Sequence, residues 1–382
     1  MRVIGIDPGT VSIDLCGLAG SSVFLDESLP TVEALANPQS IVSMVTEAMP
    51  LDLVAGQSGY GLPLVFAGDA TEDDLRLAFL PDVDDSGGIV GLRRLIRTLA
   101  QCPVPVVLTP GVIHLRSVPL HRKVNRVDIG TADKVCAVAL ALSEYAARHS
   151  CHPGDASFIM LELGGAFTAA VAVERGHIVD GLGGTSGPLG IRAAGALDGE
   201  VAFLAGSVSK RLLFGGGAAS IAGFEIDTES FARLSKEAGA GGARPEGLGV
   251  GPQAVINAAG RVAWEAYLES AIKAVVALTV SAPRADESIL SGRLARSVHV
   301  REVFAQRLSV THPKLLVHEL TGFATRASQA AQGAALIADG LVGGPSTELV
   351  ETLGIRDASG TALDYLHVIS PAAARTRLGI VS

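Results

Sequence analysis

The sequence predicts an α/β protein with two duplicated halves, and three observations support this. The 382-residue chain is long enough for two or three domains of ordinary size. Strand-like and helical segments alternate through the first half of the chain. An apolar strand that ends in an acid and a glycine turn occurs twice, near the N-terminus and again before the middle of the chain. We therefore expect two domains of related architecture.

The two copies of this repeat each predict a β-hairpin. A first apolar strand turns at Asp7 and Gly9 in the run VIGIDPGT. A second strand turns in the same way at Glu162 and Gly164 in the run FIMLELGG, and the pair Arg175-Gly176 predicts the next hairpin turn. Each half is therefore expected to begin with a hairpin that has a carboxylate at its first turn.

The remaining elements follow from hydrophobic periodicity. Further strands are expected at residues 53–55, 104–108 and 288–290, and helices at 31–48, 88–101, 131–148, 252–280 and 325–340. Thr131 is placed to cap its helix, and the Gly- and Ala-rich stretch 238–251 predicts a long loop. The run HSCHPG marks the boundary, so we expect domains at 1–152 and 153–323 and a C-terminal helix and tail at 324–382 that returns toward the first domain.

Composition excludes several classes of protein. Hydrophobic residues form 48% of the chain and charged residues 18%, which is typical of a globular protein. The net charge of -9 and the aromatic content of 4% argue against a nucleic-acid partner. The four cysteines have no metal-site spacing. The long uncharged stretches contain Pro or Gly and the N-terminus contains Asp7, so we expect no membrane segment and a cytoplasmic location.

Three turns offer chemistry for a phosphorylated ligand. Asp7 with Gly9 and Thr10 combines a carboxylate, an open backbone and a hydroxyl, which suits Mg²⁺ and a polyphosphate. Glu162 with Gly164 and Gly165 repeats this arrangement. The alternative for each turn is an ordinary hairpin that only needs an Asp cap or a glycine.

The third turn follows the apolar strand in the run ILSGRLA. Ser291, Gly292 and Arg293 occupy this turn, and a glycine without a side chain lets a nucleoside lie against the backbone. Together the three turns form an ordered set that spans most of the chain.

In this order the three turns resemble the phosphate-1, phosphate-2 and adenosine motifs of the acetate and sugar kinase, Hsp70 and actin superfamily of ATPases. The resemblance implies two ribonuclease-H-like, actin-like ATPase domains with a nucleotide cleft between them. It also implies ATP and Mg²⁺ as cofactors, with Asp7 and Glu162 as the metal-binding carboxylates. The run NRVDIGTADK is similar to the family of predicted butyrate kinases. Two departures are Arg293, where the superfamily usually has a second glycine, and Glu162, where it usually has Asp.

A polar segment at residues 121–134 supplies candidate residues for the phosphoryl acceptor. Phosphoryl transfer needs cations around the moving charge and a group that positions the acceptor. We expect Asp128 and Arg126 to act with Asp7 as catalytic residues. The expected substrate residues are Arg122, Thr131, Asp133 and Lys134, with Lys123 as a further cation, and Gly184 and Thr185 in a glycine-rich loop. The alternative is a solvated basic loop with Asp133 at a helix N-terminus.

The sequence therefore predicts a Mg-ATP-dependent phosphotransferase that acts on a small molecule, with a short-chain carboxylate such as butyrate suggested by the resemblance. One alternative is a regulatory or chaperone-like ATPase of the same fold without a small-molecule acceptor. Another is a nuclease, since the first strand also resembles that of Holliday-junction resolvases, but the acidic net charge disfavours it. The expected partners are a nucleotide and a small substrate, and a homodimer is left open.

Overall fold

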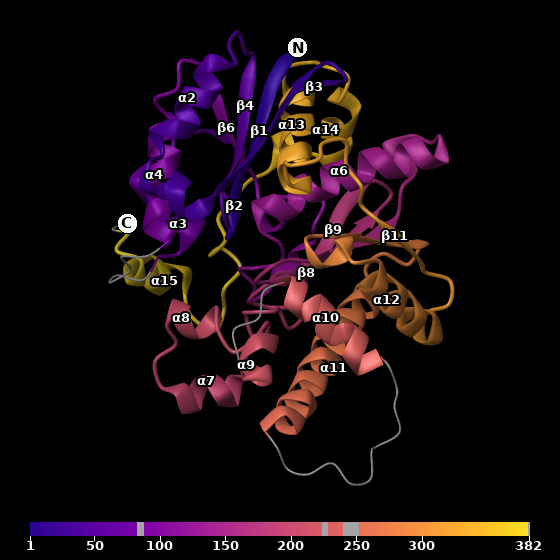
Figure 1. Ribbon diagram of the computed structural model, residues 1–382. Coiled ribbons are helices and arrows are strands. Elements are labelled where there is room, and N and C mark those ends of the chain that lie inside the picture. The colour runs from indigo at the N-terminus through magenta and orange to yellow at the C-terminus, as the bar shows by residue number, and fades with distance from the viewer. Residues whose placement is uncertain (82–87, 224–227, 240–251, 381–382) are drawn as a thin grey trace. The chain divides into compact units, whose positions relative to one another are not determined.

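The computed structural model describes residues 1–81, 88–223, 228–239 and 252–380. The chain forms two compact units (Figure 1). The first unit contains Met1–Ser157, Val173–Asp180 and Leu320–Ser382, and the second unit contains Phe158–Ala172 and Gly181–Glu319. The domain boundaries given above stay a prediction.

A six-stranded sheet forms the centre of the first unit. Its order is β3-β2-β1-β4-β6-β5, with β1 antiparallel to β2 and parallel to β4, and with β4 parallel to β6. The carboxyl ends of β1, β4 and β6 therefore lie at one edge of the sheet, where ligand sites of α/β folds usually form. The strands are β1 (Arg2–Pro8), β2 (Ser12–Ala19), β3 (Ser22–Pro30), β4 (Leu53–Gln57), β5 (Val65–Phe66) and β6 (Val106–Thr109).

Helices cover both faces of this sheet. On one face, Ile4 and Ile6 of β1 share a core with Ile41 of α2 and Leu95 of α4. On the other face, α13 packs on β1, β2 and β4 and also contacts α6 (Figure 1). The helices of this unit are α1 (Thr31–Ala36), α2 (Gln39–Glu47), α3 (Glu72–Phe79), α4 (Gly88–Leu99), α5 (Leu120–Lys123), α6 (Ala132–His149), α13 (Gln329–Leu341), α14 (Thr347–Leu353) and α15 (Pro371–Arg377).

The second sheet has five strands in the order β11-β10-β7-β8-β9, and β10 is parallel to both β7 and β11. Its strands are β7 (Phe158–Leu163), β8 (Thr168–Glu174), β9 (His177–Leu182), β10 (Glu287–Ser291) and β11 (Leu316–Glu319). The long helix α11 packs on β7 and on α12. The helices of the second unit are α7 (Gly199–Ala205), α8 (Lys210–Leu213), α9 (Ala218–Ala222), α10 (Thr228–Gly239), α11 (Pro252–Leu278) and α12 (Val298–Thr311).

The predicted α/β class with two sheets is confirmed, as are the hairpin of β1 and β2, the start of α6 after Thr131, and β10. The single helix predicted at 31–48 is wrong: α1 ends at Ala36 and α2 begins at Gln39. Pro38 causes this break, because it lacks an amide hydrogen and disfavours helical backbone in the residue before it. Most of the loop predicted at 238–251 lies outside the described residues.

The helix predicted from residue 325 begins only at Gln329. The backbone amides of Thr325, Arg326 and Ala327 donate to the carboxylate of Asp26 on β3. This side chain takes up amide groups that would otherwise start the helix. Among the helices that the structure describes, none combines the length and apolar character needed to cross a bilayer.

Gly5 is required where α13 approaches β1. A Cβ atom at this position would overlap the carbonyl oxygen of Ala331 and the amide nitrogen of Ala335. Both atoms belong to the backbone of α13, so no side-chain rotation can relieve the overlap. Gly5 therefore sets the distance between this helix and the sheet.

We expect Gly5→Ala to destabilise the protein by about 3 kcal/mol, because overpacking against a backbone forces the helix away from the sheet. Urea unfolding of the purified protein measures the effect. Gly68→Ala is the matched control, because nothing lies within 4 Å of its added Cβ, and we expect it to change the free energy of unfolding by less than about 0.5 kcal/mol. Equal stability of the two variants would contradict the role assigned to Gly5.

Candidate functional site

Asp7 lies at the carboxyl end of β1, and its side chain is buried. The hydroxyl of Ser328 donates a hydrogen bond to Oδ2 of Asp7 over 2.6 Å. Ser328 is also the N-cap of α13, since its Oγ accepts from the amide of Ala331. One serine therefore connects the first strand to the helix that covers it.

Asp26 holds the segment that carries Ser328. Its carboxylate accepts from the amide of Thr325 at 2.9 Å, from the hydroxyl of Thr325 at 2.8 Å, and from the amide of Ala327 at 2.7 Å. Partial burial opposes ionisation, but the hydrogen bonds from Ala327, Thr325 and Arg326 hold the pKa of Asp26 below its usual value. An ionised Asp26 thus positions the chain that enters α13.

The turn after β1 is tightly hydrogen-bonded. The amide of Gly9 donates to the carbonyl of Asp7 at 3.0 Å, and the hydroxyl of Thr31 donates to the carbonyl of Gly9 at 2.7 Å. Thr10 is exposed at the tip of this turn. The predicted group of Asp7, Gly9 and Thr10 therefore occupies one turn, with the acid buried and the hydroxyl in solvent.

The segment before α6 is anchored to the loops that follow β4 and β6. The amide of Ala132 donates to the carbonyl of Gly59, and the amide of Val112 donates to the carbonyl of Gly130. Asp128 is buried, and its Oδ1 accepts from the amide of Gly130 at 3.3 Å. These contacts bring the start of α6 to the edge of the sheet where Asp7 lies.

Asp133 has side-chain partners on both of its carboxylate oxygens. It accepts a hydrogen bond from Thr131 and forms an ion pair with Lys134. Burial favours its neutral form, but the Lys134 ammonium and the hydrogen bonds from Lys134 and Thr131 hold the pKa of Asp133 below its usual value. Asp133 is therefore ionised at neutral pH.

Cys136 shows that Asp7 and Asp133 share one neighbourhood. Its thiol lies 3.4 Å from the hydroxyl of Thr109 at the end of β6. Burial raises the pKa of this thiol, and the negative charges of Asp133 and Asp7 raise it further. The charges of Asp7 and Asp133, which are far apart in sequence, therefore both affect the pKa of the same buried sulfur atom.

The cations of the polar segment have different surroundings. Arg122 is half-buried and donates from Nη1 to the carbonyl of Val179 at 2.8 Å, and its Nε lies 3.9 Å from Asp180. Arg126 is half-buried as well. Lys123 is buried, donates to the carbonyl of Leu115 at 2.9 Å and stacks on Tyr365, with 5.0 Å from Nζ to the ring centre. Burial lowers the pKa of Lys123 to about 8.

In the second unit, the turns after β7 and β10 meet. Ser291 pairs with Glu162 in the parallel register of these strands. Gly292 has a φ of +91°, and a Cβ there would lie 2.5 Å from the carbonyl oxygen of Leu163. The amide of Gly164 donates to the carbonyl of Phe167, which closes the first turn. The predicted phosphate-2 and adenosine motifs are thus in direct backbone contact.

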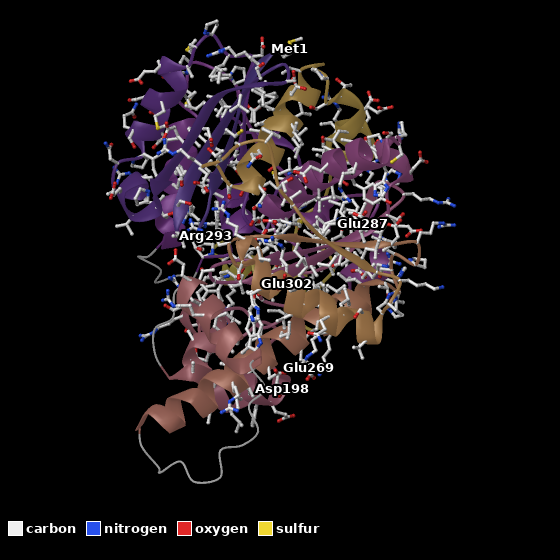
Figure 2. The ribbon with its side chains drawn as sticks, turned by 45° about the vertical axis from the view of Figure 1, so that its right-hand side comes forward. Met1, Asp198, Glu269, Glu287, Arg293 and Glu302 are labelled. Carbon is white, nitrogen blue, oxygen red and sulfur yellow. The ribbon has the colours of Figure 1, made fainter. Side chains whose placement is uncertain are left out.

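Arg293 follows this contact and is exposed at the start of the short helix Leu294–Arg296. Figure 2 labels Arg293 together with Glu287, which begins β10. In the glycine-rich loop after β9, a Cβ at Gly184 would overlap the ring of Phe167, whereas Thr185 is half-buried. Gly184 is therefore needed for packing within the second unit, whatever else the loop does.

Tyr267 of α11 is a fully buried residue that is affected by the charge of Glu162. Its hydroxyl accepts a hydrogen bond from Thr168 at 3.2 Å, and burial together with the charge of Glu162 raises its pKa. Sequence analysis did not identify Tyr267, because its distance along the chain from Glu162 leaves no local pattern. Ser328 and Asp26 were missed for the same reason, while Gln57 and Thr109 carry the weak signal of polar residues that end apolar strands.

Asp7 is the candidate metal-binding carboxylate of the first unit, and Glu162 that of the second. Within the described ranges, no group of three or more His, Cys, Asp or Glu side chains could hold a metal ion. A buried carboxylate such as Asp7 still fits Mg²⁺, because this ion keeps several of its waters and needs one or two protein carboxylates. Asp7 therefore meets the requirement for a hydrated magnesium ion.

Solved structures of carboxylate kinases share this fold. A propionate kinase from Francisella tularensis superposes with a TM-score of 0.60 at 12% identity, over 87% of this chain and 98% of the other. Acetate kinase from Entamoeba histolytica superposes with a TM-score of 0.57 at 11% sequence identity, over 81% of this chain and 87% of the other. Acetate kinase from Porphyromonas gingivalis superposes with a TM-score of 0.55 at 13% sequence identity, over 87% of this chain and 98% of the other. The chain thus shares the two-domain α/β fold of these carboxylate kinases.

The chain belongs to the family described as "Protein of unknown function (DUF1464)", whose profile matches residues 5–368. A comparison with curated proteins finds none that matches the sequence. The match to this family spans both hairpins and all of the predicted site residues.

We expect the stability of the protein to rise with pH between about 8 and 10 because of Lys123. Its pKa is about 8 in the folded protein, whereas an unfolded lysine titrates near ~10.4, so the unfolded chain binds more protons in this interval. Urea unfolding at several pH values should show a slope of up to about 1 kcal/mol per pH unit. Lys123→Met should lack this contribution, and parallel profiles for the two proteins would contradict the assignment.

Proposed function

We propose that this protein is a Mg-ATP-dependent phosphotransferase that acts on a small molecule. The observation that carries the proposal is the buried Asp7 at the carboxyl end of β1, near the same thiol as the ionised Asp133. This arrangement gives one carboxylate for a hydrated cation and a second polar group for an acceptor. The fold shared with acetate and propionate kinases supports the proposal.

We assign the nucleotide to the turns that carry glycine. At Gly292 the backbone of Leu163 fills the place of a side chain, so only glycine lets these two turns meet, and we assign the nucleoside to this meeting point. Ser291 and Glu162 flank that contact through their strand pairing, and Gly164 and Gly165 continue it. In the first unit, Gly9 and Thr10 are the residues we propose for phosphate binding. When bound, Mg²⁺ would neutralise charge on the phosphates.

The proposed acceptor is a short-chain carboxylate, with butyrate suggested by the run NRVDIGTADK. A carboxylate is already ionised at neutral pH, so neutralising the transferred charge matters more than a general base. An acceptor oxygen would attack the γ-phosphorus while the bond to the bridging oxygen of ADP breaks, which gives an acyl phosphate and ADP. Lys134, Arg126 and Arg122 are the proposed cations beside the acceptor, and Thr131 is a proposed donor. Asp128 and Asp133 hold this segment through Gly130, Thr131 and Lys134 and so position those groups. A homodimer and a cytoplasmic location stay predictions.

We expect isothermal titration to show ATP binding that depends on Mg²⁺ and is lost in Asp7→Asn. The substitution removes the charge that holds the cation but keeps the side-chain volume. Asp69→Asn, which changes an exposed carboxylate of the same unit, is the control and should bind as the parent protein does.

Incubation with ATP, Mg²⁺ and acetate, propionate or butyrate should then yield ADP and a hydroxylamine-reactive acyl phosphate. ATP binding without any phosphorylated acceptor, also among sugars and polyols, would instead favour a regulatory ATPase. The absence of binding to ATP and other nucleotides would refute the proposed function.

We expect Ser328→Ala to lower kcat by on the order of 10- to 100-fold, since a hydrogen bond to a charged group contributes about 1.5–3 kcal/mol. The variant leaves Asp7 in place but without the donor that orients it. Ser328→Thr keeps the hydroxyl and should recover most of the loss. Steady-state kinetics measure both variants, and an unchanged kcat in Ser328→Ala would show that this hydrogen bond does not support turnover.

A further inference from the structure

A second acid, Asp14, faces Asp7 across the first hairpin. The antiparallel register of β1 and β2 pairs these two residues directly. Directly opposed residues of an antiparallel pair place their side chains on the same face, about 4.5–5.5 Å apart at Cβ. This is the face that α13 covers, because Gly5, two residues before Asp7, lies against that helix. Two carboxylates therefore share a position between the sheet edge and α13.

Asp14 is almost completely buried and only partly satisfied. It is 4% exposed, and its Oδ2 accepts from the hydroxyl of Ser12 at 3.0 Å. Its Oδ1 is buried without a hydrogen-bond partner. A buried acceptor without a partner is costly, and a like charge directly opposite adds to the cost. A hydrated cation bound beside the pair would remove both costs.

Gln57 presents the complementary group on the other side of Asp7. It ends β4, two residues beyond Ala55, which pairs with Gly5 of β1, so its side chain is on the same face as Asp7. Gln57 is 6% exposed, and its Nε2 is buried without a hydrogen-bond partner. The buried carboxylate of Asp7 thus has an unsatisfied acceptor on one neighbouring strand and an unsatisfied donor on the other.

A hydrated divalent cation matches these groups. Its bound waters can donate to Oδ1 of Asp14, and a water of its outer hydration shell can accept from Nε2 of Gln57. Mg²⁺ keeps several waters and is commonly bound through one or two carboxylates.

We propose that Asp14 is the second carboxylate of a hydrated divalent-cation site at Asp7, which Gln57 completes through bound water. This inference rests on the proposed function only in that it locates the Mg²⁺ of that reaction. It predicts cation binding to the nucleotide-free protein.

The test uses Mn²⁺ as the probe, titrated into the full-length protein without nucleotide and followed by electron paramagnetic resonance. We expect Asp14→Asn to weaken binding of Mn²⁺ at least 10-fold. Glu47→Gln, which removes an exposed carboxylate from α2, should bind Mn²⁺ as the parent protein does. In EDTA, Asp14→Asn should have a higher Tm than the parent protein, because the repulsion from Asp7 is removed, and Mn²⁺ should no longer raise that Tm.

A second variant keeps the test decisive if Asp14→Asn folds poorly. Gln57→Met preserves the volume of the side chain but removes the donor, and we expect it to weaken Mn²⁺ binding several-fold. Affinities within twofold of the parent protein in both variants, or no Mn²⁺ binding to the parent protein, would overturn the proposal. Loss of Mn²⁺ binding in Asp14→Asn without any phosphotransfer by the parent protein would refute the proposed function alone. Phosphotransfer with an unaltered cation affinity in the variants would refute this inference alone.

Discussion

The first unit depends on the direct backbone contact of α13 with β1 and α6. Gly5 of β1 admits the helix on one side, and on the other a Cβ at Gly333 of α13 would overlap the carbonyl of Cys136. Contacts between backbones leave little freedom for the helix to slide or rotate. The N-cap of α13 is therefore held at one place, and its Ser328 hydroxyl meets Asp7. Packing of glycines in the core thus fixes the geometry of a polar site at the sheet edge.

Each unit builds its polar group in the same way. A hairpin strand carries a carboxylate near its end, Asp7 in the first unit and Glu162 in the second. The parallel neighbour strand ends in a polar residue, Gln57 of β4 and Ser291 of β10 respectively. A helix packs on each of these hairpin strands, α13 on β1 and α11 on β7. Strand ends supply the predicted site residues, while the glycines of the turns allow the chain to leave the sheet sharply.

The parts of the site that the sequence predicts are those encoded over a few residues. An acid followed by glycine after an apolar run is such a pattern, and it predicts Asp7 and Glu162. The partners of these residues were missed because they come from distant segments: Ser328 is 321 residues from Asp7. Lys123 was expected among the cations for phosphate, but Tyr365 and the carbonyl of Leu115 enclose it. Only the tertiary fold reveals such burial.

The hydrogen bonds from the amides of residues 325–327 to the Asp26 carboxylate have a consequence for biosynthesis. The ribosome makes the first hairpin at the beginning of synthesis and the segment that Asp26 binds some 300 residues later. Until then, the sheet face beneath α13, including Cys16 and Ala55, has no native cover. The nascent chain thus has to keep this apolar surface away from other strands while the second unit is being made, so premature termination after that unit would release a polypeptide prone to aggregate.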